Sequence, residues 1–182
     1  MVLKGNKSEL VERTFLFVKS AHGAIDQRRK YTGEPYIRHP VAVASIVSEV
    51  PHTEAMLAAA LLHDTVEDTE ISTADIEREF GVEVVELVAW LTDVSRLEDG
   101  NRSVRKAIDR EHIARATAEA KTIKLADLID NSRTFVACAP KFAAVYLQEK
   151  ALLLEVLKEG DESLWLRANE ILQSGLRSLA GC

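Results

Sequence analysis

The pair His63-Asp64 places two ionisable residues directly after the apolar run 58–62, which predicts a buried helix. Burying charge without a partner costs several kcal/mol. Glu67 and Asp68 stand four residues further along. If the helix continues to Asp68, His63 shares a face with Glu67, and Asp64 with Asp68. Three carboxylates this close repel each other unless protons or a cation intervene, so a divalent metal ion is the simplest explanation.

A second histidine, His39, stands directly before Pro40 in the segment 33–40. Proline restricts the preceding residue toward extended geometry and is itself favoured in the first turn of a helix. An imidazole held at such a loop-to-helix junction could reach the end of a neighbouring helix. Taken alone, His39 could equally be a residue that caps the helix.

The third segment that could take part in chemistry is 124–134, where apolar side chains bury one side of a predicted helix. Asp127 and Asn131 are four residues apart and share a face. Lys124 could neutralise Asp127, and a plain ion pair within the helix is the alternative interpretation. With the two histidines and Asp64, Asp127 completes a set of two nitrogen and two oxygen ligands. Such a set suits Mn, Fe, Zn or Mg-like ions and leaves room for water and a phosphate oxygen on a five- or six-coordinate ion.

The elements that must position these residues are all predicted to be helices, because helical spacing recurs and no period-2 alternation persists. Pro51 ends one helix, Thr53 can cap the next, and Ser72 with Asp75 resembles a capping box. Loops are expected at 26–38 and 97–103. Further helices are expected to about Gly23 and over 40–50, 53–63, 72–80, 82–91, 104–118, 120–134, 140–158 and 161–179. The sequence therefore predicts an all-α fold, a single helical bundle over residues 1–182.

Composition excludes several classes of protein. A hydrophobic content of 47% with 29% charged residues is typical of a globular domain, so disorder is not expected. No apolar run approaches the roughly 18 residues of a membrane-spanning helix, and residues 1–10 lack the apolar core of a secretory signal. Two distant cysteines, Cys138 and Cys182, cannot form a disulfide scaffold or a thiolate zinc site. We therefore expect a cytoplasmic protein without a membrane partner.

The charge balance restricts the partners further. A net charge of −6 does not favour nucleic acid over a broad surface, so no nucleic-acid partner is expected. A small polyanionic substrate would need a local basic patch, a metal ion, or both. The chain offers basic side chains near each histidine or aspartate segment: Arg28, Arg29, Lys30, Arg38, Lys124 and Arg133. A solvated loop is the alternative for the run 28–30.

Together these segments resemble the HD-domain metal-dependent phosphohydrolases. More narrowly, they resemble the hydrolase domain of RelA/SpoT-type enzymes and the stand-alone small alarmone hydrolases. The likeness extends over roughly residues 15–135. The matching stretches are 21–22, 27–30, 33–40, 59–69, 80–81 and 124–127, together with Asn131, Arg133 and Thr134.

The resemblance implies a metal-dependent hydrolase that removes the 3′-pyrophosphate of guanosine 3′,5′-bis(diphosphate) or its pentaphosphate relative, leaving GDP or GTP. Mn(II) is the usual ion in this family, although another divalent ion is possible. The implied metal ligands are His39, His63, Asp64 and Asp127, and the implied catalytic acidic pair is Glu67 and Asp68. The implied contacts to the nucleotide are Arg29, Lys30, Asn131 and Thr134, with Arg133 adding positive charge beside Asp127.

The sequence departs from the family pattern at three places. The loop from Lys30 to Gly33 is about one residue longer than in the bifunctional enzymes. Leu128 and Asp130 stand where many relatives have a basic residue and a histidine or tyrosine. Two alternatives therefore stay open: hydrolysis of another nucleotide (an adenine alarmone, the 2′-phosphate of NADPH or a nucleoside monophosphate), or a nucleotide-binding regulator without turnover. The sequence does not fix the oligomeric state.

Overall fold

The computed structural model describes residues 8–138 and 140–180, without the side chains of 134–144 and 179–180. Thr134 and Cys138 therefore have described backbones only, and Cys182 lies outside the described residues. The chain divides into two compact units, Met1–Thr92 and Asp93–Cys182, and each is described by itself. Within the described residues there is no strand, only an isolated bridge between Arg28 and Pro35. The all-α fold is confirmed, and the single domain stays a prediction.

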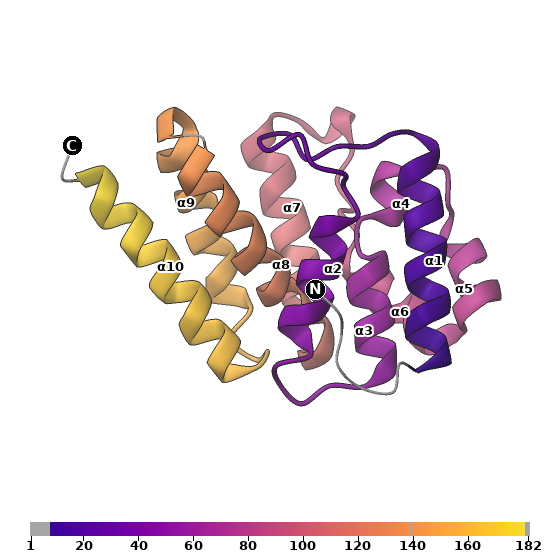
Figure 1. Ribbon diagram of the computed structural model, residues 1–182. Coiled ribbons are helices and arrows are strands. Elements are labelled where there is room, and N and C mark those ends of the chain that lie inside the picture. Colours follow the sequence, from indigo (N-terminus) through magenta and orange to yellow (C-terminus); the bar gives the residue numbers. More distant parts are fainter. Residues whose placement is uncertain (1–7, 139, 181–182) are drawn as a thin grey trace. The chain divides into compact units, whose positions relative to one another are not determined.

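Helix α3 is the centre of the first unit. It packs against α1, α2 and α6, while α5 packs against α6 and α4 against α1 (Figure 1). Seven of the nine residues of α3 are buried. A helix that is apolar on all sides belongs in a protein interior, which explains this position. The helices of the unit are α1 Glu9–Ala24, α2 Arg38–Val47, α3 Glu54–Leu62, α4 Thr65–Asp68, α5 Thr73–Phe80 and α6 Val82–Leu91.

Two predicted helix starts in the first unit are confirmed by their capping hydrogen bonds. The side chain of Thr53 accepts from the backbone N–H of Met56 at 3.1 Å. Ser72 accepts from the backbone N–H of Asp75 at 3.2 Å, and the Asp75 carboxylate accepts from the backbone N–H of Ser72 at 3.0 Å. Helix α5 ends at Phe80 and is followed by Gly81, whose φ of 87° favours glycine.

The predicted helix 53–63 is confirmed to within one residue at each end, and it does not continue to Asp68. Helix α3 ends at Leu62, and α4 begins at Thr65. The imidazole Nδ1 of His63 bonds to the carbonyl of Ala60 at 2.9 Å, and side-chain bonds of this kind compete with the regular helix ladder. The N–H of Asp68 nevertheless donates to the carbonyl of Asp64 at 3.0 Å, so these two residues keep the spacing of one helical turn.

The second unit is built around α8, which packs against α9 and α10 (Figure 1). The predicted loop 97–103 is wrong in detail, because it contains the 3₁₀ helix η1 Leu97–Asp99 and the start of α7. Asn101 caps α7 by accepting from the N–H groups of Ser103 and Val104 at 3.0 and 3.2 Å, so α7 begins two residues earlier than predicted. The α-helices of this unit are α7 Arg102–Ala114, α8 Ala118–Cys138, α9 Pro140–Val156 and α10 Glu162–Ala180.

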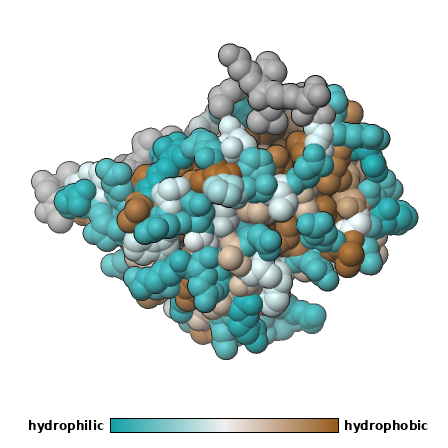
Figure 2. All heavy atoms as spheres, turned by 90° about the horizontal axis from the view of Figure 1, so that it is seen from below, coloured by the Kyte–Doolittle hydropathy of each residue, from teal (hydrophilic) through white to brown (hydrophobic). Residues whose placement is uncertain are grey.

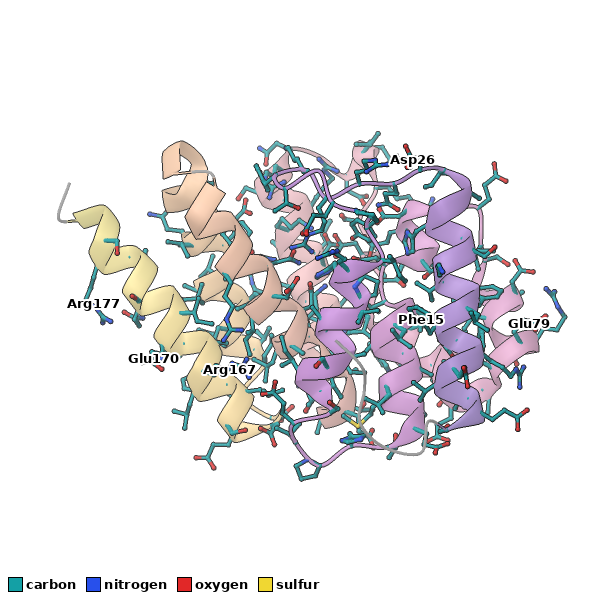
Figure 3. The ribbon with its side chains drawn as sticks, in the orientation of Figure 1. Phe15, Asp26, Glu79, Arg167, Glu170 and Arg177 are labelled. Carbon is teal, nitrogen blue, oxygen red and sulfur yellow. The ribbon has the colours of Figure 1, made fainter. Side chains whose placement is uncertain are left out.

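The visible surface is mostly hydrophilic, with smaller groups of hydrophobic residues among the polar ones (Figure 2). On α10, Glu170 and Arg177 extend away from the helix (Figure 3). Across the described part of the chain, no helix combines the length and the apolar character that crossing a membrane requires.

Candidate metal centre and acid–base site

Three potential metal ligands of the first unit converge on one point: His39, His63 and Asp64. Their ligand atoms all lie within 4.8 Å of one another. The Nε2 atoms of the two histidines are 3.2 Å apart. The Asp64 Oδ2 lies 3.5 Å from the Nε2 of His39 and 3.1 Å from the Nε2 of His63. The two predicted imidazole ligands and one of the two predicted aspartates therefore come together.

These separations fit the chemistry of a bound divalent ion. Ligands about 2.1 Å from an ion and about 90–109° apart are separated by roughly 3.0–3.4 Å, close to the three observed distances. Both histidines are buried, and Asp64 is partly exposed on its side chain. Two imidazole nitrogens and a carboxylate oxygen that face one another need a proton or a cation between them. The donor set therefore fits a divalent metal.

Neighbouring residues orient two of these ligands. The Nδ1 of His63 donates to the carbonyl of Ala60, which leaves the lone pair of the neutral ring on Nε2 and directs it toward His39. The hydroxyl of Tyr36 donates to the Oδ2 of Asp64, and the Tyr36 ring lies 5.8 Å from that of His39. Partners of this kind fix ring tautomers and carboxylate positions at metal sites.

Asp64 is held in its charged form. Burial in itself raises its pKa, but the nearby imidazoles of His63 and His39 outweigh this effect and hold the pKa of Asp64 well below its usual range. An ionised carboxylate is the form that binds a metal, so the ligand is ready at neutral pH.

The predicted acidic pair lies on α4, directly after the ligands. Glu67 and Asp68 are both exposed, in contrast to the buried imidazoles. Asp68 Oδ2 accepts a hydrogen bond of 2.8 Å from the side-chain amide of Gln27. Gln27 in turn contacts His22, with 2.5 Å between its Oε1 and the histidine Nδ1. Solvent access with a fixed orientation suits a residue that exchanges protons with water.

The loop between α1 and α2 carries the predicted basic residues. It begins at Asp26, which is labelled beside the end of α1 in Figure 3 and has a φ of 44°. Arg29 is partly buried, and its backbone N–H donates to the carbonyl of Glu34 at 2.8 Å. Lys30 is exposed, with its ammonium 5.5 Å from the ring centre of Tyr31. The predicted loop is confirmed, and it presents both side chains at the surface of the first unit.

The remaining predicted site residues belong to the second unit, on α8. Asp127 is buried, and its carboxylate contacts Lys124 Nζ at 3.1 Å and Asn131 Nδ2 at 2.5 Å. The ion pair of the alternative interpretation is therefore present, and so is the predicted shared face of Asp127 and Asn131. Arg133 is exposed, and the side chain of Thr134 lies outside the described residues. The role of Asp127 as a metal ligand stays a prediction.

A second group of charges in this unit was not anticipated. Lys106 donates to Asp93 at 2.6 Å and lies 3.4 Å from Asp109. Burial raises the pKa of Asp93, but Lys124 and Lys106 lower it below its usual value. Burial lowers the pKa of Lys150, although Asp127 acts in the opposite direction. The unit thus holds several ammonium groups near its carboxylates.

Tyr36 and Gln27 are the residues of the first unit that sequence reasoning missed as parts of the site. Both lie in segments that carry the family resemblance, so their proximity to His39 along the chain was visible. Their contacts with Asp64 and Asp68 join positions 28 and 41 residues apart, which no local pattern reveals. His22, at the end of α1, contacts Gln27 and so connects this helix to the loop.

Comparison with known families agrees with this geometry. The family described as HD domain matches residues 16–153. This chain belongs to the HD domain family. Its resemblance to RelA/SpoT-type hydrolases is confirmed by relatives and by a solved structure that carry such names.

Two curated relatives and one structure define the likeness. A probable guanosine-3′,5′-bis(diphosphate) 3′-pyrophosphohydrolase from Synechocystis sp. is 39% identical over 135 residues, which is 72% of this chain and 17% of that protein. The guanosine-3′,5′-bis(diphosphate) 3′-pyrophosphohydrolase of Drosophila melanogaster is 44% identical over 117 residues, covering 63% of this chain and 64% of that protein. A structure described as a metazoan ortholog of SpoT that hydrolyses ppGpp superposes with a TM-score of 0.84 at 31% identity, over 96% of this chain and 99% of that one. The chain spans less than a fifth of the long curated relatives.

Proposed function

We propose that this chain hydrolyses the 3′-pyrophosphate of guanosine 3′,5′-bis(diphosphate) and of its pentaphosphate relative. Water adds to the phosphorus next to the ribose, and the bond from that phosphorus to the 3′ oxygen breaks. The products are pyrophosphate and GDP or GTP. The observation that carries this proposal is the cluster of His39, His63 and Asp64, followed one turn later by an acidic pair. The relatives named for this reaction supply the substrate class.

The acidic pair on α4 would move the protons of this reaction. Glu67 and Asp68 are exposed and directly follow the ligand Asp64. One carboxylate would take a proton from the attacking water, and the ribose 3′ oxygen needs a proton as it leaves. Proton transfer by a positioned carboxylate contributes about 10²–10⁴-fold to a rate. A regulator without turnover would have no need of this pair, and its presence favours an enzyme.

His39, His63 and Asp64 would hold the divalent ion, and Asp127 is the predicted fourth ligand. We propose Mn(II), because a mixed set of imidazole and carboxylate ligands suits it. When bound, the ion would supply Lewis-acid chemistry to the phosphate and to water. The chain's own contribution is to keep Asp64 ionised and to aim the Nε2 of His63 inward.

Basic and amide side chains would bind the nucleotide. Arg29 and Lys30 on the loop of the first unit are proposed to face the base and phosphates, as the resemblance implies. Asn131, Arg133 and Thr134 on α8 are proposed to contact the nucleotide from the second unit. A cytoplasmic location, where nucleotides of this kind would meet the protein, belongs to the same proposal.

The experiment that tests the proposal is a nucleotide panel with Mn(II). The panel contains the guanine and adenine 3′,5′-bis(diphosphates), NADPH and nucleoside monophosphates, and it separates pyrophosphate from orthophosphate release. We expect pyrophosphate from the guanine substrate at the highest kcat/KM. Orthophosphate from NADPH or a monophosphate at a much higher kcat/KM would contradict the proposal. Glu67→Gln should lower turnover and retain the metal, whereas retained turnover would contradict the role of the acidic pair.

A further inference from the structure

Two consecutive hydrogen bonds connect the interior of the first unit to the acidic pair. The side-chain amide of Gln27 donates to Asp68 Oδ2 at 2.8 Å, and its Oε1 lies 2.5 Å from the Nδ1 of His22. His22 is buried at 2% exposure, at the end of α1. Its ring lies 4.9 Å from that of Tyr36, which itself bonds to Asp64. Neither His22 nor Gln27 has a role in the function proposed above.

The Asp68 carboxylate determines which atom donates in each of these two hydrogen bonds. An ionised carboxylate only accepts hydrogen bonds, so the NH₂ group of Gln27 must face Asp68. The amide oxygen of Gln27 then faces His22, and the Nδ1 of His22 must donate. The Nε2 of His22 is buried without a hydrogen-bond partner among the described residues, which suits a ring nitrogen without a proton. The contacts therefore select one tautomer of His22, with its proton on Nδ1.

The backbone of Gln27 is held independently of its side chain. Its N–H donates to the carbonyl of His22 at 3.1 Å, and its carbonyl accepts from the N–H of Tyr36 at 3.0 Å. The loop therefore keeps its course when the side chain is changed. The side chain is left with one task that the structure shows, which is to join His22 to Asp68.

We propose that Gln27 is a positioning residue for Asp68 and that His22, as the Nδ1–H tautomer, holds the Gln27 amide in the orientation that this requires. The inference rests on the proposed acid–base role of Asp68. A carboxylate on a four-residue helix such as α4 has several rotamers, and one donor fixed from the neighbouring loop selects among them. Because both residues are proposed to act through Asp68, the loss of either should lower kcat and leave KM nearly unchanged.

Paired substitutions separate this role from a structural one. Gln27→Met keeps the length of the side chain and removes the donor. We expect kcat to fall about tenfold to a hundredfold, as for other partners that orient catalytic groups, with KM changed less than about threefold and bound metal unchanged. Gln173→Met, at an exposed position of α10, is the matched control. An unchanged kcat, or a raised KM at unchanged kcat, overturns the proposal.

His22 is tested by replacing only its donor. The amide nitrogen of asparagine lies at the same number of bonds from the backbone as the Nδ1 of histidine. Leucine has nearly the shape of asparagine but no donor. His22→Leu should lose about tenfold in kcat, and His22→Asn should recover most of that loss. Equal losses in the two variants overturn the proposal, because they assign His22 a packing role.

A readout without substrate distinguishes this inference from the proposed function. Nitrogen-15 correlation spectra of the Mg(II)-loaded protein report which nitrogen of His22 carries the proton. We expect the Nδ1–H tautomer in the wild-type protein and a loss of that preference in Gln27→Met. An Nε2–H tautomer in the wild type overturns the inference. A failure of the proposed function would appear separately, as no pyrophosphate release by the wild-type protein.

Discussion

The two units of the chain provide different partners for their aspartates. In the first unit, Asp64 faces the Nε2 atoms of two histidines and the hydroxyl of Tyr36. In the second unit, Asp127 contacts the ammonium of Lys124, and Asp93 contacts that of Lys106. The first arrangement gathers lone pairs at one point, whereas the second pairs each carboxylate with a cation of the protein itself.

An added cation is therefore expected to bind most strongly in the first unit. A carboxylate that already has a lysine partner gains less from a metal ion than a cluster of imidazoles and a carboxylate does. We therefore expect substitutions in the first cluster to change metal binding, and substitutions of Asp93 and Asp109, which pair with Lys106 in the second unit, to change stability.

The largest effect is expected for His63→Ala. This change removes a buried nitrogen ligand whose lone pair is directed by the Ala60 carbonyl. We expect the bound divalent ion to be lost and turnover to fall by more than about a thousandfold, which exceeds the effect of removing a partner outside the ligand set. Metal analysis and pyrophosphate release measure the two losses. His52→Ala is the control, because His52 is exposed and its Nδ1 lies 2.7 Å from the carbonyl oxygen of Val50, away from the ligand set.

The next effect is expected for Asp109→Ala in the second unit. Asp109 is buried and accepts from the N–H groups of Val94 and Ser95 at 3.1 and 2.9 Å. Its removal leaves these donors without their acceptor and should lower the free energy of unfolding by about 3 kcal/mol in urea titrations. Glu111→Ala, exposed on the same helix, should change it by less than about 0.5 kcal/mol. Loss of metal from Asp109→Ala at an unchanged free energy of unfolding would contradict the stabilising role of Asp109 in the second unit.

A smaller effect is expected for Tyr36→Phe in the first unit. This change removes only the hydroxyl that donates to Asp64. The affinity for a divalent ion should fall about tenfold in calorimetric titrations, because partners that orient a ligand typically contribute this much. Tyr31→Phe, at an exposed position of the same loop, should leave the affinity unchanged. Equal affinities for Tyr36→Phe and the wild type would show that Asp64 needs no such support.

The smallest effect concerns Asp75, which belongs to the cap of helix α5 and to neither cluster. Hydrogen bonds from the Ser72 side chain and backbone, and then from Arg78, lower the pKa of Asp75 to about 2. The pKa in the unfolded chain is higher, so this stabilisation is present above about pH 4 and is lost as the pH falls toward 2. The difference in melting temperature between the wild type and Asp75→Asn should therefore shrink between pH 5 and pH 2.5. A constant difference over this range would contradict the assignment.

Local features of the fold could be predicted from the sequence because their causes are local. Thr53 and the pair Ser72 and Asp75 form the predicted caps, since a cap depends on residues within one turn. The start of a separate helix at Thr65, after the predicted end at 63, could not be predicted in this way. It depends on His63 bonding to Ala60 while it faces His39, and that arrangement is set by the packing of α2 against α3.

The candidate site was predictable in its residue types and less so in its connections. His39, His63 and Asp64 were predicted as ligands from their chemistry and their family resemblance, and the structure brings their ligand atoms together. The contacts of Tyr36 and Gln27 join a loop to helix ends through tertiary structure. No spacing rule for a single helix or strand contains such contacts.

Crystals loaded with Mn(II) and measured by anomalous diffraction give the most direct test of a metal centre in the first unit. We expect one strong peak about 2.0–2.3 Å from the Nε2 atoms of His39 and His63 and from a carboxylate oxygen of Asp64. A peak at another position would contradict the proposed metal centre. So would a protein at full Mn(II) occupancy in which the Nε2 of either histidine lies outside coordination distance of the ion.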